Sequence, residues 1–380
     1  MKVLHVIPSV SAVHGGPSRA IGLIERALTA RGVRVETATT DDDGPRRRLD
    51  RPLRVAVPEN GVQRWFFMRQ LHFYKVSLDF ARWIRQRVRD YDLVHVHGLF
   101  SFTSVLAAWT ARSARVPYVI RPLGTLNHYG IAQRRPELKQ LSLRFIERGL
   151  LRDASAVHFT SIEEAEQAGD LGIALRSVII PLGVEACPGP LAAEAAGTQR
   201  LLFLSRLDPK KNVEGLLRAF SLCKAQLPGL VLHIAGAGEH VYVASLHALA
   251  KQLGVSQDVV WMGHVEGDEK ARALAEAQAF VLPSLSENFG IAAAEALMAG
   301  LPCILARGVP LAPSMQEAGA GLCVEPDAES IADGIRQLMS DPQGRQRMRA
   351  AAAALARQKY SVHAMGDRLA GLYTDILART

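Results

Sequence analysis

The chain has 380 residues, of which 48% are hydrophobic and 22% are charged, a composition typical of a globular protein with more than one domain. An intrinsically disordered protein is therefore excluded. The four cysteines are widely spaced and form no CxxC pair, so the sequence predicts neither a disulfide framework nor a structural zinc site and favours a reducing cytoplasm. Because no stretch approaches the roughly 18 apolar residues of a membrane span, we expect a soluble or peripheral protein.

The formal net charge of +8 is confined to the first half of the chain. Residues 1–180 hold 27 Lys and Arg against 17 Asp and Glu, a balance of +10, whereas residues 181–380 hold 18 against 20, a balance of −2. A basic half indicates an acidic partner, either nucleic acid or an anionic membrane surface. Since no zinc finger, helix-turn-helix or aromatic ribonucleoprotein motif is present, we expect no nucleic-acid partner.

Short β-branched runs alternate with longer helical patterns along the chain, which is typical of parallel βαβ units. In the first half they predict strands at residues 2–8, 34–39, 93–97, 118–121, 156–160 and 178–181. Residues 183–198 are rich in Gly, Pro and Ala and predict a linker. Beyond it, strands are predicted at residues 200–205, 231–235, 259–262, 280–283, 303–306 and 321–324. The sequence therefore predicts an α/β protein of two doubly wound domains, residues 1–182 and 199–360, with a ligand cleft between them.

Residues 64–90 combine seven aromatic and seven basic side chains with only two acidic ones. Two interpretations remain open for this segment. A basic, aromatic helix is typical of peripheral enzymes that lie on anionic membranes. Alternatively, the aromatic side chains pack in a domain core and the basic face is only solvated.

Two short motifs have the spacing of metal ligands. Asp41 and Asp43 form a DxD pattern, but three arginines follow at once and favour a solvated loop. His95 and His97 lie two residues apart on a predicted strand and therefore point to one face. A metal site at the two histidines needs a third ligand, and none is evident in the sequence.

The segment 283–304, PSLSENFGIAAAEALMAGLPCI, predicts a strand end, a glycine-containing loop and a helix that ends near Gly300. The N-terminus of such a helix offers backbone N–H groups and a positive dipole end to a phosphate. Glu287 and Glu295 are eight residues apart, about 12 Å along a continuous helix, so one ligand atom cannot contact both. They suit two hydroxyl-bearing parts of an extended ligand, on either side of a diphosphate. An ordinary surface helix is the alternative.

The segment 201–220, LLFLSRLDPKKNVEGLLRAF, predicts a buried strand followed by Arg206 and, five residues later, by Lys211 at the start of a helix. Two cations on one strand-to-helix loop suit a diphosphate leaving group that no metal neutralises. Solvated basic residues in a loop are the alternative.

Together these motifs resemble those of glycosyltransferase family 4, the retaining enzymes of the GT-B fold. Arg206 and Lys211 match the family's GRLxxxKG pattern, although Ser205 and Asn212 stand in the places of its two glycines. The other matches are the E-x7-E pattern at Glu287 and Glu295 with Phe289-Gly290 in the expected place, a Gly-Gly loop that begins at Gly15, and a GxG turn within AGAGE at residues 235–239. The resemblance covers nearly the whole chain.

The resemblance implies a role for each matched residue. Arg206, Lys211 and Glu287 are the implied catalytic residues: the two cations bind the diphosphate and the glutamate binds hydroxyls of the transferred sugar. Glu295 is implied to bind the ribose hydroxyls. The other implied donor-binding residues contribute backbone groups or a close backbone approach, and they are Gly15, Gly16, Gly236, Gly238, Asn288, Phe289 and Gly290. Family members typically need no metal for catalysis, so we expect none here.

The chain departs from the family after the strand that ends at Arg121. Many members carry a His there, near the donor sugar, and aligning the strand puts Leu123 in its place. Arg121, His128 and His97 are the polar residues that we consider as contacts of the acceptor or the donor sugar. In retaining transfer the departing phosphate is able to take the acceptor proton, so the missing His bears on sugar identity more than on activity.

The resemblance thus implies two Rossmann-like domains that face each other across a cleft, with a helix at residues 361–380 that returns to the first. It predicts a retaining, metal-independent transferase of a hexose-type sugar from a UDP- or GDP-linked donor, with no further cofactor. We expect the acceptor to be a cell-surface polysaccharide, lipopolysaccharide or lipid-linked oligosaccharide, and the protein to be cytoplasmic or peripheral at the inner membrane face. The alternatives are a GT-B sugar-nucleotide epimerase and an inactive nucleotide-sugar-binding or membrane scaffold protein.

Overall fold

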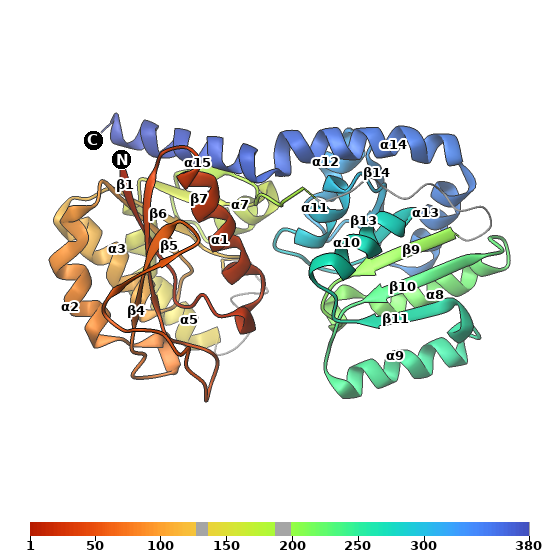
Figure 1. Ribbon diagram of the computed structural model, residues 1–380, viewed down its shortest axis with the longest axis horizontal. Coiled ribbons are helices and arrows are strands. Elements are labelled where there is room, and N and C mark those ends of the chain that lie inside the picture. The colour runs from red at the N-terminus through yellow and green to blue at the C-terminus, as the bar shows by residue number, and fades with distance from the viewer. Residues whose placement is uncertain (127–135, 187–198, 380) are drawn as a thin grey trace. The chain divides into compact units, whose positions relative to one another are not determined.

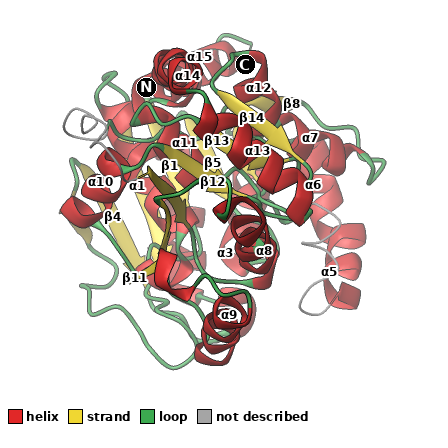
Figure 2. Cartoon of the chain, turned by 90° about the vertical axis from the view of Figure 1, so that its right-hand side faces the viewer, coloured by secondary structure: helices red, strands yellow, loops and turns green. Residues whose placement is uncertain are grey.

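The computed structural model describes residues 1–126, 136–186 and 199–379. The chain divides into two compact units. Unit 1 comprises Met1–Gly183 and Val362–Thr380, and unit 2 comprises Val184–Ser361. Most of the predicted linker, from residue 187 onward, lies outside the described residues. Helices flank the strands in both views, as Figures 1 and 2 show.

Unit 1 contains a twisted sheet whose described strands follow the order β3-β4-β2-β1-β5-β6-β7-β8. All neighbours are parallel except β3 and β4, which are antiparallel. The strands are β1 (Lys2–Val6), β2 (Arg34–Thr40), β3 (Ala56–Glu59), β4 (Val62–Phe67), β5 (Leu93–His97), β6 (Tyr118–Arg121), β7 (Ala156–Phe159) and β8 (Ser177–Ile179). The predicted parallel α/β architecture is thereby confirmed for this unit.

The helices of unit 1 connect and cover these strands. They are α1 (Gly16–Thr29), α2 (Leu78–Arg87), α3 (Phe102–Ala114), α5 (Pro136–Ser142), α6 (Arg148–Asp153), α7 (Ile162–Gly169) and α15 (Val362–Leu377), with 3₁₀ turns η1 (Ala12–His14), η2 (Phe73–Lys75) and η3 (Val88–Asp90) and a π-helical segment η4 (Leu143–Glu147). Three of them begin at a serine whose hydroxyl accepts a hydrogen bond from the first turn: Ser77, Ser101 and Ser161. None of the described helices is long and apolar enough to cross a bilayer.

The crossovers of unit 1 leave β1 in opposite directions. Chain order runs from β1 to β2 on one side, while β5 pairs with the other side of β1 and leads on to β6. The boundary between β1 and β5 is therefore the topological switch point, where open α/β sheets place ligands at the carboxyl ends of their strands.

Residues 64–90 do not form the single basic, aromatic helix that one interpretation of the sequence requires. The segment contains part of β4, then η2, and only then α2. Phe66, Phe67 and Phe80 are at most 1% exposed, and Phe67 and Phe80 belong to the main core with Leu4 and Val94. The core interpretation is therefore right for most of these aromatic side chains. Phe73 is the exception, since it is 55% exposed.

Unit 2 is a second parallel α/β layer structure with the described strand order β11-β10-β9-β12-β13-β14. Its strands are β9 (Gln199–Leu204), β10 (Leu230–Ala235), β11 (Val259–Gly263), β12 (Ala279–Leu282), β13 (Cys303–Ala306) and β14 (Gly321–Val324). Its helices are α8 (Val213–Lys224), α9 (His240–Gln252), α10 (Gly267–Glu276), α11 (Ile291–Met298), α12 (Ala312–Glu317), α13 (Ala328–Ser340) and α14 (Pro342–Leu355), with turns η5 (Pro209–Lys211) and η6 (Ser256–Asp258) and a π-helical segment η7 (Ala356–Tyr360). The switch point of this sheet lies between β9 and β12, whose following loops carry the predicted donor site.

Candidate active site

The loop between β9 and α8 is fixed by Asn212. This residue has φ +54°, a left-handed conformation that only Gly, Asn and Asp adopt readily, which explains why Asn replaces the family's glycine here. Its Oδ1 accepts a hydrogen bond from Gly215 N at 3.2 Å and caps α8. Its Nδ2 donates to the carbonyl oxygens of Pro283 and Pro326 at 3.2 and 2.7 Å. Asn212 therefore joins this loop to the end of β12.

The loops that follow β9 and β12 bring Lys211 and Glu287 together. The backbone N–H of Leu285 donates to the carbonyl of Lys210 at 2.8 Å, which aligns the two loops. Lys211 Nζ then lies 2.5 Å from Glu287 Oε1, and Ser284 Oγ donates to the same oxygen at 3.0 Å. The side chains of Lys211 and Glu287 are 13% and 12% exposed, so the pair is shielded but still reachable by a ligand.

The N-terminus of α11 follows directly after this pair. Gly290 has φ +90° and caps the helix, and because it has no side chain it makes no side-chain hydrogen bond to the N–H groups of the first turn. Phe289 turns its side chain into unit 2, where it is 4% exposed and lies edge-on to Tyr360. The ring of Phe289 thus packs inside unit 2 and does not reach the loop surface. The helix N-terminus therefore lies where the sequence predicts one, and its role in anion binding stays a prediction.

Glu295 lies on α11 and has a cationic partner that the sequence does not reveal. The Glu295 side chain is 9% exposed, and its Oε1 accepts a hydrogen bond from Lys270 Nζ on α10 at 3.0 Å. No spacing in the sequence places α10 beside α11, because the two helices are separated by β12. The available signal was physical: a carboxylate on the buried face of an apolar helix requires a cation or hydrogen-bond donors nearby.

Gly236 and Gly238 allow the loop after β10 to touch the loop after β9. A Cβ atom at Gly236 would lie 1.8 Å from the Ser205 carbonyl oxygen, and one at Gly238 would lie 2.3 Å from that of Leu207. The close approach lets Leu207 N donate to Ala237 O at 2.8 Å. Both glycines thus have a packing role, and through it they shape the segment that carries Arg206.

Arg206 faces a pocket of about 520 Å³ between this loop and the start of α9. Gly238 and Tyr242 contribute to its walls. Arg206 is exposed, and within the described part of the chain no carboxylate forms an ion pair with it. Its charge is therefore available to an anionic ligand, whereas that of Lys211 is shared with Glu287.

The site residues that the sequence predicts in unit 1 differ in their surroundings and in their exposure. Gly15, with φ +67°, caps α1, and Gly16 opens that helix. Arg121 and His97 end β6 and β5 but are only 3% and 0% exposed. For His97 this burial, together with a 2.8 Å hydrogen bond to His5, does not fit a substrate contact. His128 lies outside the described residues.

The aspartates of the DxD pattern do not form an open metal loop. Asp41 is 3% exposed and accepts a hydrogen bond from the backbone of Arg69, and Asp43 accepts one from Ser11. Between them Asp42 is buried against Arg69 and Lys75. Burial alone would raise the pKa of Asp42, but hydrogen bonds and these two cations hold it well below its usual range. The expectation of a solvated loop was wrong for the aspartates and right for the exposed arginines that follow.

Two protein-family models match the chain. The model for the glycosyl transferase 4-like domain matches residues 15–183, and the model for glycosyl transferases group 1 matches residues 193–355. The chain belongs to the group 1 glycosyltransferases. The resemblance based on Arg206, Lys211, Glu287 and Glu295 is thereby confirmed at the level of the family.

Named relatives share sequence with this glycosyltransferase along much of its length. It is 26% identical to the GDP-mannose:cellobiosyl-diphosphopolyprenol alpha-mannosyltransferase of Komagataeibacter xylinus, over 100% of this chain and 94% of that protein. The protein of the same description from Xanthomonas oryzae pv. oryzae is 30% identical over 66% of this chain and 65% of its own length. The glycogen synthase of Mycobacterium tuberculosis is 29% identical over 54% of this chain and only 51% of that synthase.

Solved structures confirm the GT-B fold. Sucrose-phosphate synthase from Thermosynechococcus elongatus superimposes with a TM-score of 0.78 at 19% identity, over 100% of both chains. WaaG, described as a glycosyltransferase involved in lipopolysaccharide biosynthesis, superimposes with a TM-score of 0.67 at 16% identity, over 98% of this chain and 99% of its own. At these identities the likeness establishes the fold and leaves the substrates open.

Proposed function

We propose that this glycosyltransferase moves mannose from GDP-mannose to a lipid-linked oligosaccharide in the synthesis of a cell-surface polysaccharide. The observation that carries the proposal is the full-length similarity to a mannosyltransferase whose description names that donor and a diphosphopolyprenol-linked acceptor. The shielded Lys211–Glu287 pair in front of α11 supports it, because it offers a cation to a diphosphate and a carboxylate to a sugar in one place. A nucleoside diphosphate sugar is then the co-substrate, and no further cofactor is required.

Each donor-site residue has a distinct role in this proposal. Arg206 and Lys211 neutralise the diphosphate together with the N–H groups that open α11. Glu287 accepts hydrogen bonds from hydroxyls of the mannosyl group, and the backbone of residues 288–290 borders the same part of the donor. Glu295, oriented by Lys270, accepts hydrogen bonds from the ribose hydroxyls.

We propose retention of configuration at the anomeric carbon, without a catalytic metal. As the sugar–phosphate bond breaks, positive charge develops on the sugar ring and negative charge on the departing phosphate. Arg206 and Lys211 stabilise the departing oxygens in the way a metal does in other transferases. The phosphate then accepts the proton of the acceptor hydroxyl, which attacks from the face that the phosphate has left.

The acceptor and the membrane belong to unit 1 in this proposal. Its basic half would attract an anionic surface at the cytoplasmic face of the membrane. Apolar side chains exposed on η2 and η4 supply anchors, since Phe73 is 55% and Phe145 is 71% exposed. The two segments are neighbours, because Tyr74 and Ser142 lie within hydrogen-bond distance, 3.4 Å apart. Several relatives support a lipid-bearing acceptor by their descriptions, among them an alpha-monoglucosyldiacylglycerol synthase of Streptococcus pneumoniae.

A donor panel followed by a transfer assay tests the proposal. The full chain is mixed with GDP-mannose, GDP-fucose, UDP-glucose and UDP-N-acetylglucosamine, and the melting temperature is recorded, because a ligand of the native state stabilises it according to its occupancy. We expect the largest increase with GDP-mannose, and mannosyl transfer to a diphospholipid-linked oligosaccharide in the presence of EDTA. Stabilisation by UDP-sugars alone would contradict the donor assignment. Conversion of the donor without any acceptor would favour the epimerase, and binding without turnover the inactive scaffold.

A further inference from the structure

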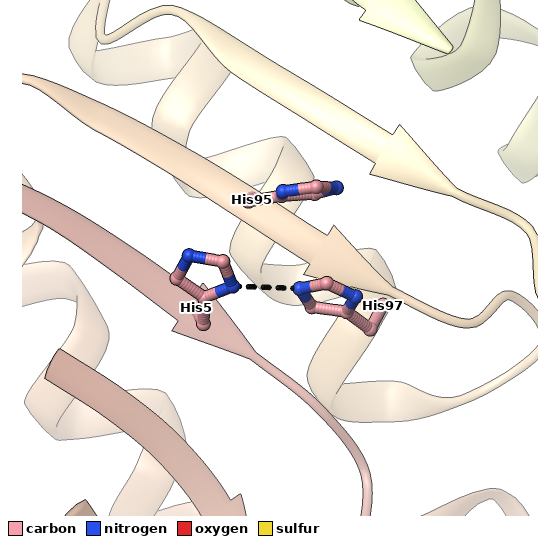
Figure 3. Close-up of side chains that lie close together, drawn as sticks. All are labelled: His5, His95 and His97. Carbon is pink, nitrogen blue, oxygen red and sulfur yellow. Dashed lines mark hydrogen bonds between the residues drawn. The ribbon is translucent and has the colours of Figure 1, made fainter. Parts of the chain in front are cut away.

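Three histidines meet inside unit 1 at its topological switch point. His5 lies on β1, and His95 and His97 lie on the neighbouring strand β5, with His5 and His95 in register. Figure 3 shows the rings of His5 and His97 edge to edge and joined by a hydrogen bond, with the ring of His95 beside them; the His95 and His97 rings are stacked, with centroids 4.2 Å apart. All three residues are 0% exposed. One ring nitrogen from each lies within 4.8 Å of those from the other two.

The hydrogen bonds of this cluster leave ring nitrogens unused. His5 Nδ1 and His97 Nε2 are 2.8 Å apart and share one proton. His95 Nδ1 lies 2.6 Å from the hydroxyl of Tyr373 on α15. The remaining nitrogens, His5 Nε2, His95 Nε2 and His97 Nδ1, are buried without a hydrogen-bond partner. One ion cannot contact all three of these atoms, because the unused nitrogens of His5 and His97 lie on the ring sides away from the proton that the two rings share. A bound ion would therefore replace that proton and use His5 Nδ1 and His97 Nε2, together with Nε2 of His95. Buried polar atoms without partners, such as His95 Nε2, are rare in folded proteins and call for an explanation such as an ion.

We propose that His5, His95 and His97 bind one divalent transition-metal ion of the zinc class, which ties β1 to β5. Imidazole nitrogen suits zinc, copper, nickel or iron, whereas magnesium and calcium prefer oxygen ligands. At a metal–nitrogen distance of about 2.0–2.1 Å, tetrahedral ligand nitrogens are about 3.4 Å apart. The spacing in the cluster, from 2.8 Å to at most 4.8 Å, brackets that value. Only small ring movements are therefore needed, and the fourth position is left for a water molecule.

Burial and a hydrogen bond to Tyr373 favour the form and the orientation of the histidine rings that metal binding requires. All three residues are 0% exposed, and burial favours the neutral form of an imidazole ring, which is the form that binds a metal. The Tyr373 hydroxyl occupies Nδ1 of His95 and leaves Nε2 as the nitrogen that this ring offers. Such an outer hydrogen bond is typical of metal-bound histidine, because it fixes the tautomer and the ring orientation.

The positive charge of Arg121 disfavours the binding of a metal cation at the three histidines. The buried guanidinium of Arg121 lies close enough to lower the pKa of all three histidines, and it disfavours a bound cation for the same reason. Glu164 offsets part of this charge, since it raises the pKa of Arg121 against the effect of burial. The site therefore gains affinity if Arg121 is neutralised. That response would not be seen at a surface site elsewhere on the chain.

Metal analysis of the full-length protein tests the proposal. The chain is produced in zinc-supplemented medium, desalted and analysed for metal, and a second sample is exchanged with Co²⁺, whose visible spectrum reports tetrahedral coordination. We expect one equivalent of zinc per chain, the tetrahedral cobalt spectrum and an increase in melting temperature over the metal-free protein. His95→Gln should abolish all three. His72→Gln, which alters an exposed histidine near Asp42, should change none of them.

Two further variants keep the test decisive if His95→Gln fails to fold. Tyr373→Phe keeps the ring and removes the hydrogen bond to His95, and it should weaken metal binding about 10–100-fold. Arg121→Met should strengthen it. Substoichiometric metal in the wild-type protein, or equal affinity in the wild type and in both variants, would overturn the proposal and leave the cluster as a neutral hydrogen-bonded network. Because none of the donor-site residues is a ligand, metal-free enzyme should still bind GDP.

Discussion

The two glutamates of the donor site have different neighbours, and this difference separates their functions. Glu287, in the loop before α11, is paired with Lys211 of η5, whereas Glu295, on α11 itself, is paired with Lys270 of α10. In the proposed donor complex only Glu287 contacts the sugar. Binding of GDP and of GDP-mannose therefore distinguishes the two residues.

Glu287→Gln should weaken GDP-mannose and leave free GDP unaffected. Loss of a hydrogen bond to a charged group costs about 1.5–3 kcal/mol, which corresponds to roughly 10–150-fold in affinity for the sugar-bearing ligand. Free GDP lacks the sugar, and the released charge of Lys211 remains available to its diphosphate. Isothermal titration with both ligands measures the difference, and Glu295→Gln, the matched variant, should weaken both. Equal losses for the two ligands in Glu287→Gln would refute its role at the sugar.

Lys270→Met should affect stability and nucleotide binding together. The substitution removes the cation from a largely buried carboxylate, so the desolvation of Glu295 is no longer compensated by this contact. We expect a loss of about 1–3 kcal/mol in the free energy of unfolding and weaker binding of GDP. Urea unfolding and titration with GDP provide the two readouts. Lys251→Met changes an exposed lysine of unit 2 and should alter neither, and an unchanged affinity in Lys270→Met would show that Lys270 does not orient Glu295.

At the scale of the elements, the strands that follow most directly from the sequence are short runs of mostly apolar or β-branched residues. β5, β6 and β13 are buried on both faces and consist mostly of β-branched or other apolar residues, so their positions follow from the sequence. β4 was missed because Arg64 lies in its interior. The structure accommodates this cation by a buried ion pair with Glu25 of α1, at 2.5 Å, which no local pattern reveals. A strand that contains a buried charge cannot be predicted from the periodicity of its own residues when the partner of that charge lies on a distant element.

The π-helical segment η4 contains a glutamate that should make stability depend on pH. Glu147 is 1% exposed and accepts a hydrogen bond from Phe100 N at 3.0 Å, and burial raises its pKa to about 7 from the usual 4.5. Below pH 4.5 the carboxyl is protonated in the folded and unfolded chains alike. As pH rises toward 7, the unfolded chain ionises first, so the fold loses about 3 kcal/mol relative to low pH.

Glu147→Gln removes this titration and gives the test. The variant should be more stable than the wild type at about pH 8 and similar to it near pH 4.5, because only the wild type has a buried carboxylate to ionise. Urea unfolding at the two pH values measures the difference. A stability difference that is the same at both values would show that Glu147 does not titrate in the folded protein in this range.

At the scale of the whole molecule, the groups of residues that the sequence does not predict are those whose members are far apart in the chain and meet only in the fold. The spacing of His95 and His97 places two possible metal ligands on one face of a strand, but His5, the third ligand that we propose, is 90 residues away from His95 in the sequence. Parallel pairing of β1 with β5 brings them into register, and Tyr373 reaches the cluster from the C-terminal helix. The donor motifs, in contrast, lie within short segments around Lys211 and Glu287. Their chemistry is therefore visible before the fold is known.

The excess positive charge of the molecule lies in the first half of the chain, and the structure shows which of the basic side chains are exposed there. Arg69 and Lys75 are paired with buried Asp42 and contribute little to an exterior surface. Arg82, Arg85 and Arg87 on α2 are exposed, and so are the apolar side chains of η2 and η4. In the proposed membrane-bound state, the arginines of α2 provide the electrostatic attraction and the apolar side chains of η2 and η4 insert at the headgroup boundary.

The full chain should sediment with vesicles that contain phosphatidylglycerol, dissociate as salt is raised, and ignore neutral phosphatidylcholine vesicles. Each exposed cation near an anionic surface contributes about 1 kcal/mol, and the attraction is confined to a Debye length. Replacing Arg82, Arg85 and Arg87 by Gln should therefore weaken binding at low salt. Replacing Phe73 and Phe145 by Ser should weaken the component of vesicle binding that persists at high salt.

Three exposed arginines of unit 2 provide the matched control for the loss of charge. Replacing Arg272, Arg347 and Arg357 by Gln lowers the net charge by the same three units, so a general charge effect would reduce sedimentation equally. If unit 1 carries the membrane surface, this control binds vesicles like the wild type, and both sets of variants retain their affinity for GDP. If the wild-type protein stays in the supernatant with anionic vesicles at low salt, the membrane proposal is refuted, and the basic half serves either an acidic soluble acceptor or solubility alone.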